Sequence, residues 1–539
     1  MTAGTVTPYR SAGPAGRDGF AQLLRAEWIK FRSVRGWVIG MVVAALLMLA
    51  VGLLLVQNGG GCSSSNGPPS AAGCAPPKIP VGPGGEAVTD NFYFVRQPLT
   101  GNGSITAQMT SLTGVYVPGP GSALVNLGSQ VNARGLQQWS KAGIIIKQST
   151  KPGSAYAAMM VTGSHGVRMQ YDYTQDIAGL PGKVSAAHPR WLRLTRSGDT
   201  ITGYDSADGS HWTSVGTADL AGLPSTVQVG LFTASPNYGS ESTSFGSGNF
   251  FSSPTLANGV FDHVSVSGGQ HSGAWTGDAI GSPTGFGPNG QSGEGFQQAG
   301  GKFTVTGTGD IAPLVVGPGS GGATGTIEEH LFGTFAGLIA VIVVATMFIT
   351  AEYRRGLIRV TLAASPRRGR VLAAKAIVIG LVTFAMGLIT AGIAEPVGVH
   401  LSRDQGLYIM PVSWLTAVRV VVGTAALLAV GAVLALAVGA VLRRSAAAIT
   451  AVIVGVVLTY FLGVAPGILP SGVGEWLLRL TPAAGFAIQQ SLPKWPQVAG
   501  AYSLPNYYPL APWAGFAVLC GYAALAMGLA LFLLRRRDA

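Results

Sequence analysis

The chain has 539 residues, of which 10% are charged and 48% are hydrophobic, and its mean hydropathy is +0.40. This balance lies outside the usual range of a soluble enzyme and indicates a membrane protein. The net charge of +12 does not indicate nucleic-acid binding. Residues 57–325 have a net charge of −1 and the remainder has a net charge of +13. The cations cluster beside apolar runs, as they do at the ends of membrane spans.

Residues 1–35 contain a Gly- and Pro-rich tail followed by an amphipathic helix. Its apolar stripe is formed by Phe20, Leu24, Trp28 and Phe31, at spacings of four, four and three residues. A basic helix of this kind beside a span is expected to lie in the membrane interface, in contact with lipid, rather than to cross it. The alternative is an ordinary juxtamembrane helix anchored by Trp28.

Six apolar runs are long enough to cross a hydrocarbon core as helices. Because Lys and Arg beside spans resist translocation, the cations predict a multi-pass protein of the cell membrane with both termini in the cytoplasm. Residues 57–325 are then extracellular. The expected spans are residues 36–56, 331–351, 373–394, 415–441, 446–465 and 512–534.

Residues 57–87 form a Gly/Ser/Pro-rich linker that cannot build a core. It contains Cys62 and Cys74, which in an oxidising compartment predict a disulfide; a free pair is the alternative. No further metal-ligand type stands near them, so no metal site is expected.

Residues 88–268 show short alternating runs separated by turn residues, which predicts an all-β sandwich or jelly roll inserted between the first two spans. The order of these runs, from KAGIIIK to RWLRLTRSGDTITGYDS, resembles the concanavalin A-like (laminin-G or glucanase-like) domains. Residues 269–325 are expected to form an extra β segment and a linker back to the membrane.

The polar and aromatic residues of this β region give little indication of catalysis. Asp199, Asp205 and Asp208 are expected in hairpin turns, where Asp is favoured for backbone reasons, rather than as a catalytic pair. Four aromatic residues are candidate contacts to a cell-surface glycan, although core packing is the usual role of such residues. They are Tyr171, Tyr173, Trp191 and Trp212.

The segment EYRRGLIRVTLAASPRRGRVLAAK joins the second and third runs. It resembles the cytoplasmic loop of ATP-binding cassette (ABC) permeases of the type-2 exporter class, where a short helix, expected here at 352–363, docks on the ATPase. RAEWIKFRS resembles the elbow helix of actinobacterial members, and LTPAAGFAI resembles their outer gate segment. The resemblance implies that residues 352–370 form the ATPase-coupling loop. Its candidate site residues are Glu352, Arg354, Arg355, Gly356, Arg359, Ser365, Pro366, Arg367 and Arg368. The resemblance assigns the elbow to Leu24, Glu27, Trp28 and Phe31, and the outer gate to Pro482 and Gly485.

No P-loop string occurs in the chain, so this resemblance implies a non-enzymatic permease subunit. Residues 331–539 would hold spans two to six, and ATP and Mg would be bound by separate ABC ATPase subunits. The permease would pair with a second copy or with a related permease. The alternative function is a membrane-anchored glycan-binding or sensing protein without transport activity.

Overall fold

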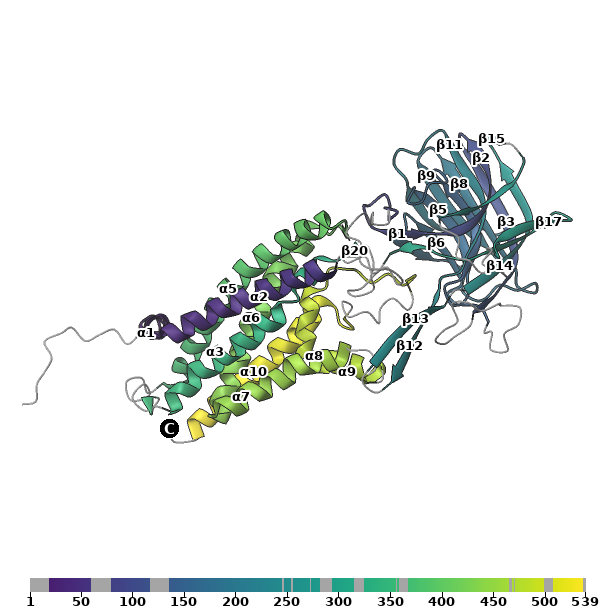
Figure 1. The fold of residues 1–539 in the computed structure, drawn as a ribbon. Coiled ribbons are helices and arrows are strands. Elements are labelled where there is room, and N and C mark those ends of the chain that lie inside the picture. The colour runs from purple at the N-terminus through teal and green to yellow at the C-terminus, as the bar shows by residue number, and fades with distance from the viewer. Residues whose placement is uncertain are drawn as a thin grey trace, which may run out of the picture.

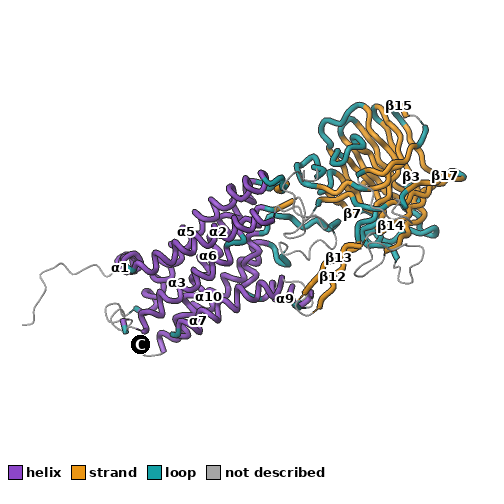
Figure 2. Tube along the Cα trace, viewed as in Figure 1, coloured by secondary structure: helices purple, strands orange, loops and turns teal. Residues whose placement is uncertain are grey.

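A computed structural model of the chain consists of a helical bundle and a β-sandwich at opposite ends of an elongated molecule (Figure 1; Figure 2). The two linkers between them follow the first span and precede the second, so the sandwich is an insertion in the bundle. The structure describes residues 19–59, 79–116, 135–244, 247–253, 255–271, 273–281, 293–314, 324–354, 356–357, 367–464, 468–469, 471–498 and 508–536.

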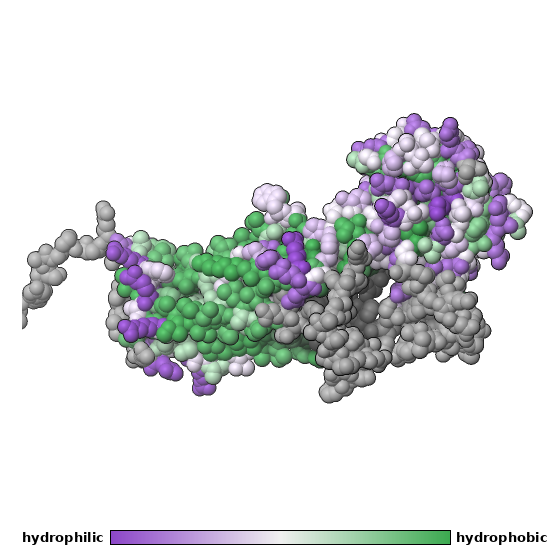
Figure 3. Space-filling view, turned by 45° about the horizontal axis from the view of Figure 1, so that its top comes forward, coloured by the Kyte–Doolittle hydropathy of each residue, from purple (hydrophilic) through white to green (hydrophobic). Residues whose placement is uncertain are grey.

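Six of the described helical segments are long and apolar enough to cross a membrane, which confirms the prediction of a six-span protein. A broad band of hydrophobic side chains covers the bundle, whereas hydrophilic side chains gather at its far end and on the sandwich (Figure 3). The helices are α1 (Phe20–Ser33), α2 (Arg35–Gly59), η4 (Ile327–Leu331), α3 (Thr334–Arg354), α5 (Arg368–Asp404), α6 (Trp414–Leu442), α7 (Ser445–Val452), η5 (Ile453–Leu458), α8 (Thr459–Val464), α9 (Ser471–Leu480), η6 (Pro482–Gln489) and α10 (Pro512–Arg536).

Two spans differ from the sequence expectation. The third span was expected to end at residue 394, but α5 continues through Pro396 to Asp404 and has 37 residues. Proline is tolerated inside membrane helices because neighbouring groups satisfy the freed carbonyl. The fifth span contains a π-helical turn, η5, between α7 and α8, which apolar periodicity alone does not reveal.

The sandwich has two antiparallel sheets, as the alternating runs predicted. One has the strand order β10-β9-β8-β3-β14-β18-β17, and the other has the order β15-β2-β11-β4-β5-β6-β7, with β16 paired to β2. Further two-stranded pairs are β1-β19, β12-β13 and the parallel pair β20-β21. The strands are β1 (Val88–Asp90), β2 (Phe92–Thr100), β3 (Gly103–Tyr116), β4 (Lys141–Lys147), β5 (Tyr156–Thr162), β6 (Val167–Tyr171), β7 (Gln175–Ala178), β8 (Arg190–Ser197), β9 (Thr200–Ser206), β10 (Thr213–Asp219), β11 (Thr226–Ala234), β12 (Tyr238–Ser244), β13 (Ser247–Ser253), β14 (Thr255–Ser267), β15 (Gln270–His271), β16 (Thr276–Ile280), β17 (Gly295–Ala299), β18 (Lys302–Gly307), β19 (Ile311–Pro313), β20 (Thr324–Gly325) and β21 (Tyr408–Ile409).

Alternation of apolar and polar residues places one face of each sheet in the core. In β14 the side chains of Ala257 and Phe261 are buried while intervening residues are partly exposed, the period-two pattern of a half-buried strand. By contrast, β4 is buried on both faces. Ile144 packs into the core between the sheets, and Ile145 belongs to a second cluster on the opposite side with Phe92 and Ile311.

The described strands between residues 269 and 313 pair with strands of the sandwich. Strand β18 pairs with β14, and its Phe303 and Val305 lie in the core between the sheets. Strand β16 pairs with β2. Asp205 was expected in a hairpin turn, but it lies within β9. Its side chain is 1% exposed and accepts a hydrogen bond from the backbone N–H of Leu180.

The two linkers to the bundle meet at one place on the sandwich, where β1 pairs with β19. Each of these neighbouring segments is held to β4 by a buried lysine. Lys147 Nζ lies 2.8 Å from Asp90 Oδ2, and Lys141 Nζ lies 2.6 Å from Asp310 Oδ1. Because a lysine is rarely buried without a partner, these pairs fix the ends of the insertion to the middle of the sheet.

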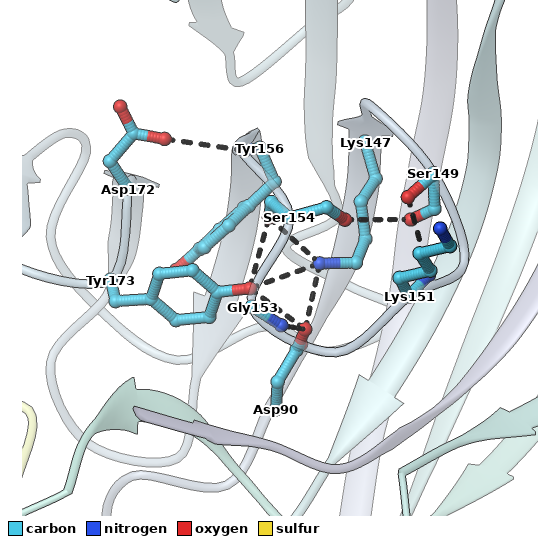
Figure 4. A network of polar contacts seen from close by, with 9 residues as sticks. All are labelled: Asp90, Lys147, Ser149, Lys151, Gly153, Ser154, Tyr156, Asp172 and Tyr173. Carbon is cyan, nitrogen blue, oxygen red and sulfur yellow. Dashed lines mark hydrogen bonds and ion pairs between the residues drawn. The ribbon is translucent and has the colours of Figure 1, made fainter. Parts of the chain in front are cut away.

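Asp90 is the centre of the larger of these clusters (Figure 4). Its Oδ2 also accepts hydrogen bonds from the Tyr173 hydroxyl at 2.7 Å and the Gly153 backbone N–H at 2.8 Å. Burial lowers the pKa of Lys147, and the charge of Asp90 opposes that effect. Burial, together with Asp90, raises the pKa of Tyr173 well above its usual value. The cluster is therefore a buried network that ties β1 to β4.

The base of the sandwich contacts the bundle directly. The Tyr408 hydroxyl donates a hydrogen bond to the Gly85 carbonyl, and the Gln497 side chain donates one of 3.0 Å to the Tyr173 carbonyl. Ala87 packs in a small apolar cluster with Met410 and Leu492. These contacts join the insertion to the loops before α6 and α10.

Candidate functional site

The end of the bundle away from the sandwich is the basic end, which contains α1, the C-termini of α3 and α10, and the N-terminus of α5 (Figure 1). Here α1 lies across the bundle and packs against α5. Val34 is extended between α1 and α2, so the chain turns sharply before it enters the first span. Three segments that are far apart in sequence therefore meet at this end.

Four charged side chains form a buried network, the lysine–glutamate quartet, where these segments meet. Lys375 Nζ lies 2.7 Å from both Glu27 Oε2 and Glu352 Oε1. Lys30 Nζ lies 2.5 Å from Glu352 Oε1 and 3.3 Å from Glu27 Oε1. The quartet thus connects α1 to α3 and to α5 through charge-assisted hydrogen bonds.

The charges of the quartet balance, two positive and two negative. Glu27, Glu352 and Lys375 are at most 2% exposed, so each depends on the others to compensate the loss of water. Burial alone would lower the pKa of Lys30, but the hydrogen bond to Glu352 and the charge of Glu27 raise it above its usual value. Lys375 also lies 4.8 Å from the centre of the Phe348 ring.

The structure places the predicted elbow residues on different faces of α1. Phe31 is 3% exposed and packs edge-on against Phe348, while Leu24 packs against the same core. Trp28, the third member of the predicted apolar stripe, is 45% exposed and does not face the core of the bundle. Glu27 takes its place, because the buried face is formed around the charges of α3 and α5.

The predicted coupling loop is described in part. Arg354 and Arg367 are exposed, and Gly356 is exposed with a φ of 68°, a conformation that favours glycine. The Arg368 guanidinium donates a hydrogen bond of 2.6 Å to the Leu534 carbonyl. The expected short helix does not begin at Glu352, because α3 continues to Arg354 and Glu352 is buried in the quartet. Four of the predicted positions lie outside the described residues: Arg355, Arg359, Ser365 and Pro366.

Sequence reasoning did not identify the role of two quartet members. Neither Lys30 nor Lys375 was among the residues predicted for the elbow or the coupling loop. A signal was present, since Lys375 stands inside an apolar run in which its neighbours Ala374 and Val378 are buried. A lysine in that setting requires an acidic partner.

The predicted outer gate is a short 3-10 helix, η6, wedged between α6 and α10 at the sandwich end. Pro482 lies in its first turn, and Gly485 lies so close to α10 that an added Cβ would be 2.7 Å from Leu519. The ring of Phe486 lies 4.4 Å from that of Phe335. The Gln489 side chain donates hydrogen bonds to Thr334 and Thr424. This irregular segment is packed against protein on all these sides.

The four candidate glycan contacts do not form one surface. Tyr173 is 1% exposed and held by Asp90, so it is corrected to a core residue. Tyr171, at the end of β6, packs against the core between the sheets. Trp191 lies 5.4 Å from the His263 ring, and the Arg193 guanidinium lies 3.9 Å from the centre of the Trp212 ring. These two tryptophans are partly exposed but already contact protein side chains.

The described residues contain no group of three His, Cys, Asp or Glu side chains that could hold a metal ion. Cys62 and Cys74 lie outside the described residues.

The helical part of the chain matches a known family. Residues 320–539 match the family described as "ABC-2 family transporter protein". This part of the chain is similar to ABC-2 transporter permease domains, which normally have no catalytic activity and work with ATPase subunits. A search among curated proteins gave no match.

Solved structures similar to the chain share little sequence with it. A functionally unknown protein from Saccharomyces cerevisiae has 14% identity over 32% of this chain and 71% of that one, with a TM-score of 0.19. The GH43 protein BlXynB from Bacillus licheniformis has 14% identity over 24% of each chain, with a TM-score of 0.16. Scytalido-glutamic peptidase has 8% identity over 42% of this chain and 100% of that one, with a TM-score of 0.24. Scores of this size support no statement about function.

Proposed function

We propose that the chain is the permease subunit of an ABC exporter and that a separate ATPase drives it through the loop 352–370. The observation that carries this proposal is the lysine–glutamate quartet, which ties α1, α3 and α5 together on both sides of that loop. The basic end is then cytoplasmic, and the sandwich is extracellular, because the cations cluster at the basic end.

The quartet supports a mechanical role for the loop. Glu352 lies two residues before Arg354, where the described part of α3 ends, and Lys375 lies one to two turns into α5. A force applied to the loop by the ATPase would reach both helices through one charged contact. It would also reach α1, since Glu27 and Lys30 belong to the same network. The three helices would therefore move as one unit.

The other end of the pathway would be closed by η6. Because η6 is short, 3-10 helical and packed between α6 and α10, a small relative movement of those helices would change its contacts. Irregular backbone near a membrane is expected where it packs on protein or lines a pathway. ATP and Mg would be bound by the partner, and two permease units, identical or related, would enclose one pathway.

The test is reversal of two loop charges, R354E/R355E, in the full chain expressed with its partner ATPase. Repulsion at a charged contact costs several kcal/mol, so co-purification of the ATPase should fall by orders of magnitude. The variant should still reach the membrane, since other cations remain in the same loop.

The matched control is R403Q/R479Q, which removes two exposed or partly exposed arginines at the sandwich end. It should leave ATPase binding unchanged. If R354E/R355E binds its ATPase and stimulates hydrolysis as the unmodified chain does, the loop does not couple the two subunits and the proposal is wrong.

A further inference from the structure

A second feature of the basic end is an apolar groove on the outside of the bundle. It lies between α5 and α10, with Val430 and Val433 of α6 at its floor, and has a volume of about 380 Å³. Small side chains on the two walls leave this space open: Ala373 and Ala376 on α5, and Ala523 and Ala524 on α10.

The length of the groove matches one leaflet of a bilayer. Its lining residues run from Gly369 to Ile377 on α5 and from Cys520 to Leu531 on α10. At 1.5 Å per residue these stretches measure about 12 Å and about 16 Å. A hydrocarbon core is about 30 Å thick, so the groove extends from the basic end to roughly the middle of the membrane.

Two cations lie at the end of the groove nearest the basic end of the bundle, one on each of the two wall helices. Arg370 precedes the groove residues Ala373 and Ile377 by three and seven positions, and Arg535 follows Leu531 by four, so each lies on the groove face of its helix. Both arginines are exposed. The bond from Arg368 to the Leu534 carbonyl holds the two helix ends together beneath the groove.

Within the part of the chain that the structure describes, the charges of Arg370 and Arg535 are not compensated by an acidic side chain. Within the described ranges, the ion pairs of the basic end are those of the quartet, and neither Arg370 nor Arg535 takes part in an ion pair. An apolar groove of one-leaflet length with a pair of uncompensated cations at its mouth matches the chemistry of an anionic phospholipid. Basic pockets between membrane helices are known to bind such headgroups.

We propose that the groove between α5 and α10 binds one anionic phospholipid, with an acyl chain along Ala373, Ala376 and Ala524 and the headgroup phosphate between Arg370 and Arg535. Arg370 is the last residue of the proposed coupling loop 352–370, so the site borders the proposed ATPase contact. Lys375 lies less than two turns from Arg370 on α5. The lipid would therefore contact the helix that carries the centre of the quartet.

The test uses the full chain in a neutral detergent and measures bound lipid by native mass spectrometry. Dioleoyl phosphatidylglycerol and dioleoyl phosphatidylcholine are added in equal amounts, so that only the headgroup differs. The unmodified chain should retain one phosphatidylglycerol in preference. The variant R370Q/R535Q should lose this preference, by about fivefold for each arginine removed. R403Q/R479Q, which removes the same charge at the other end of the bundle, should retain it.

A second variant tests the apolar part of the site. A524L places a larger side chain in the groove and should reduce retention of both lipids without changing the arginines. Inorganic phosphate added to the chain with bound phosphatidylglycerol should not displace the lipid, because phosphate cannot occupy the apolar groove. Equal retention of the two lipids by the unmodified chain, or unchanged retention by both R370Q/R535Q and A524L, would overturn the proposal.

Discussion

The sandwich and the membrane domain both bury lysines on carboxylates, but they arrange them differently. In the sandwich each lysine has its own acid, since Lys147 pairs with Asp90 and Lys141 pairs with Asp310. In the membrane domain Lys375 is shared between Glu27 and Glu352. The sandwich pairs join β4 to the neighbouring linker strands, whereas the quartet joins helices of three separate segments.

The two arrangements suit different tasks: a lysine with one partner fixes a position, and a lysine shared between two partners connects parts that move. Lys147 has Asp90 as its one acidic partner, and hydrogen bonds from Tyr173 and Gly153 hold the Asp90 carboxylate in a single orientation. A shared lysine can keep one partner while it loses the other. On the proposed function, the sandwich pairs hold an insertion in place and the quartet transmits movement between helices.

The largest effect is expected for K375M, which leaves two buried carboxylates without their common partner. Breaking a buried pair costs about 3–5 kcal/mol, and the loss here should lie at the upper end of that range because two acids are affected. The unfolding temperature of the full chain in detergent should fall strongly. K30Q, at a residue that is partly exposed, should cost less. Equal effects of the two variants would show that Lys375 is not the centre of the network.

A smaller loss, about 3 kcal/mol, is expected for K147M in the sandwich, since Asp90 keeps the hydrogen bonds from Tyr173 and Gly153. The measurement is urea unfolding of residues 79–315 expressed alone, which should show a β-type circular dichroism spectrum. The double variant K147M/D90N should recover stability, because it removes both charges and keeps an acceptor for Tyr173 and Gly153. A double variant as unstable as K147M would contradict the role of an unpaired charge.

A third variant, R96Q, removes a surface pair in the same sheet. Arg96 lies 2.6 Å from Asp278, but the Asp278 side chain is 51% exposed. An exposed pair of this kind contributes about 0–1 kcal/mol, so urea unfolding of residues 79–315 should change little. A loss as large as that of K147M would mean that burial does not decide the strength of these pairs.

The smallest effect concerns two histidines of the sandwich whose pKa values should shift in opposite directions. Hydrogen bonding to Asp208 raises the pKa of His211, and burial lowers the pKa of His165, which stacks on Trp139. The contribution of His211 is present at low pH and is lost as the pH rises through its raised pKa. His165 instead reduces stability as the pH falls below the usual histidine range. NMR titration should place the two values on opposite sides of that range, and D208N should lower the value for His211 alone.

The fold was predictable where the signal is local. Apolar length identified the six spans, and alternation identified the sandwich. The continuation of α5 through Pro396 was missed because proline usually ends a helix in water, a rule that membrane packing relaxes. The pairing of β18 with β14 was not predicted, because the sequence of a strand does not indicate which strand it pairs with.

The candidate site was predictable in its location but not in its chemistry. The elbow and loop sequences indicated where α1 and α3 would matter. The burial of Glu27 could not be read from the helix alone, because it depends on Lys375, which lies 348 residues away in the chain. For the same reason Tyr173 was offered as a glycan contact, although its partner Asp90 fixes it in the core.

The pairing of β1 with β19 bears on how the two architectures came to share one chain. Val88 lies opposite Pro313, so the insertion starts and stops at neighbouring points. Paired residues in antiparallel strands have Cα atoms about 5 Å apart, a gap that a tight turn can close. A protein lacking residues 88–313 would thus keep the connection between its first two spans. Ends that lie side by side are typical of a domain inserted into another, because the host chain can be closed between them.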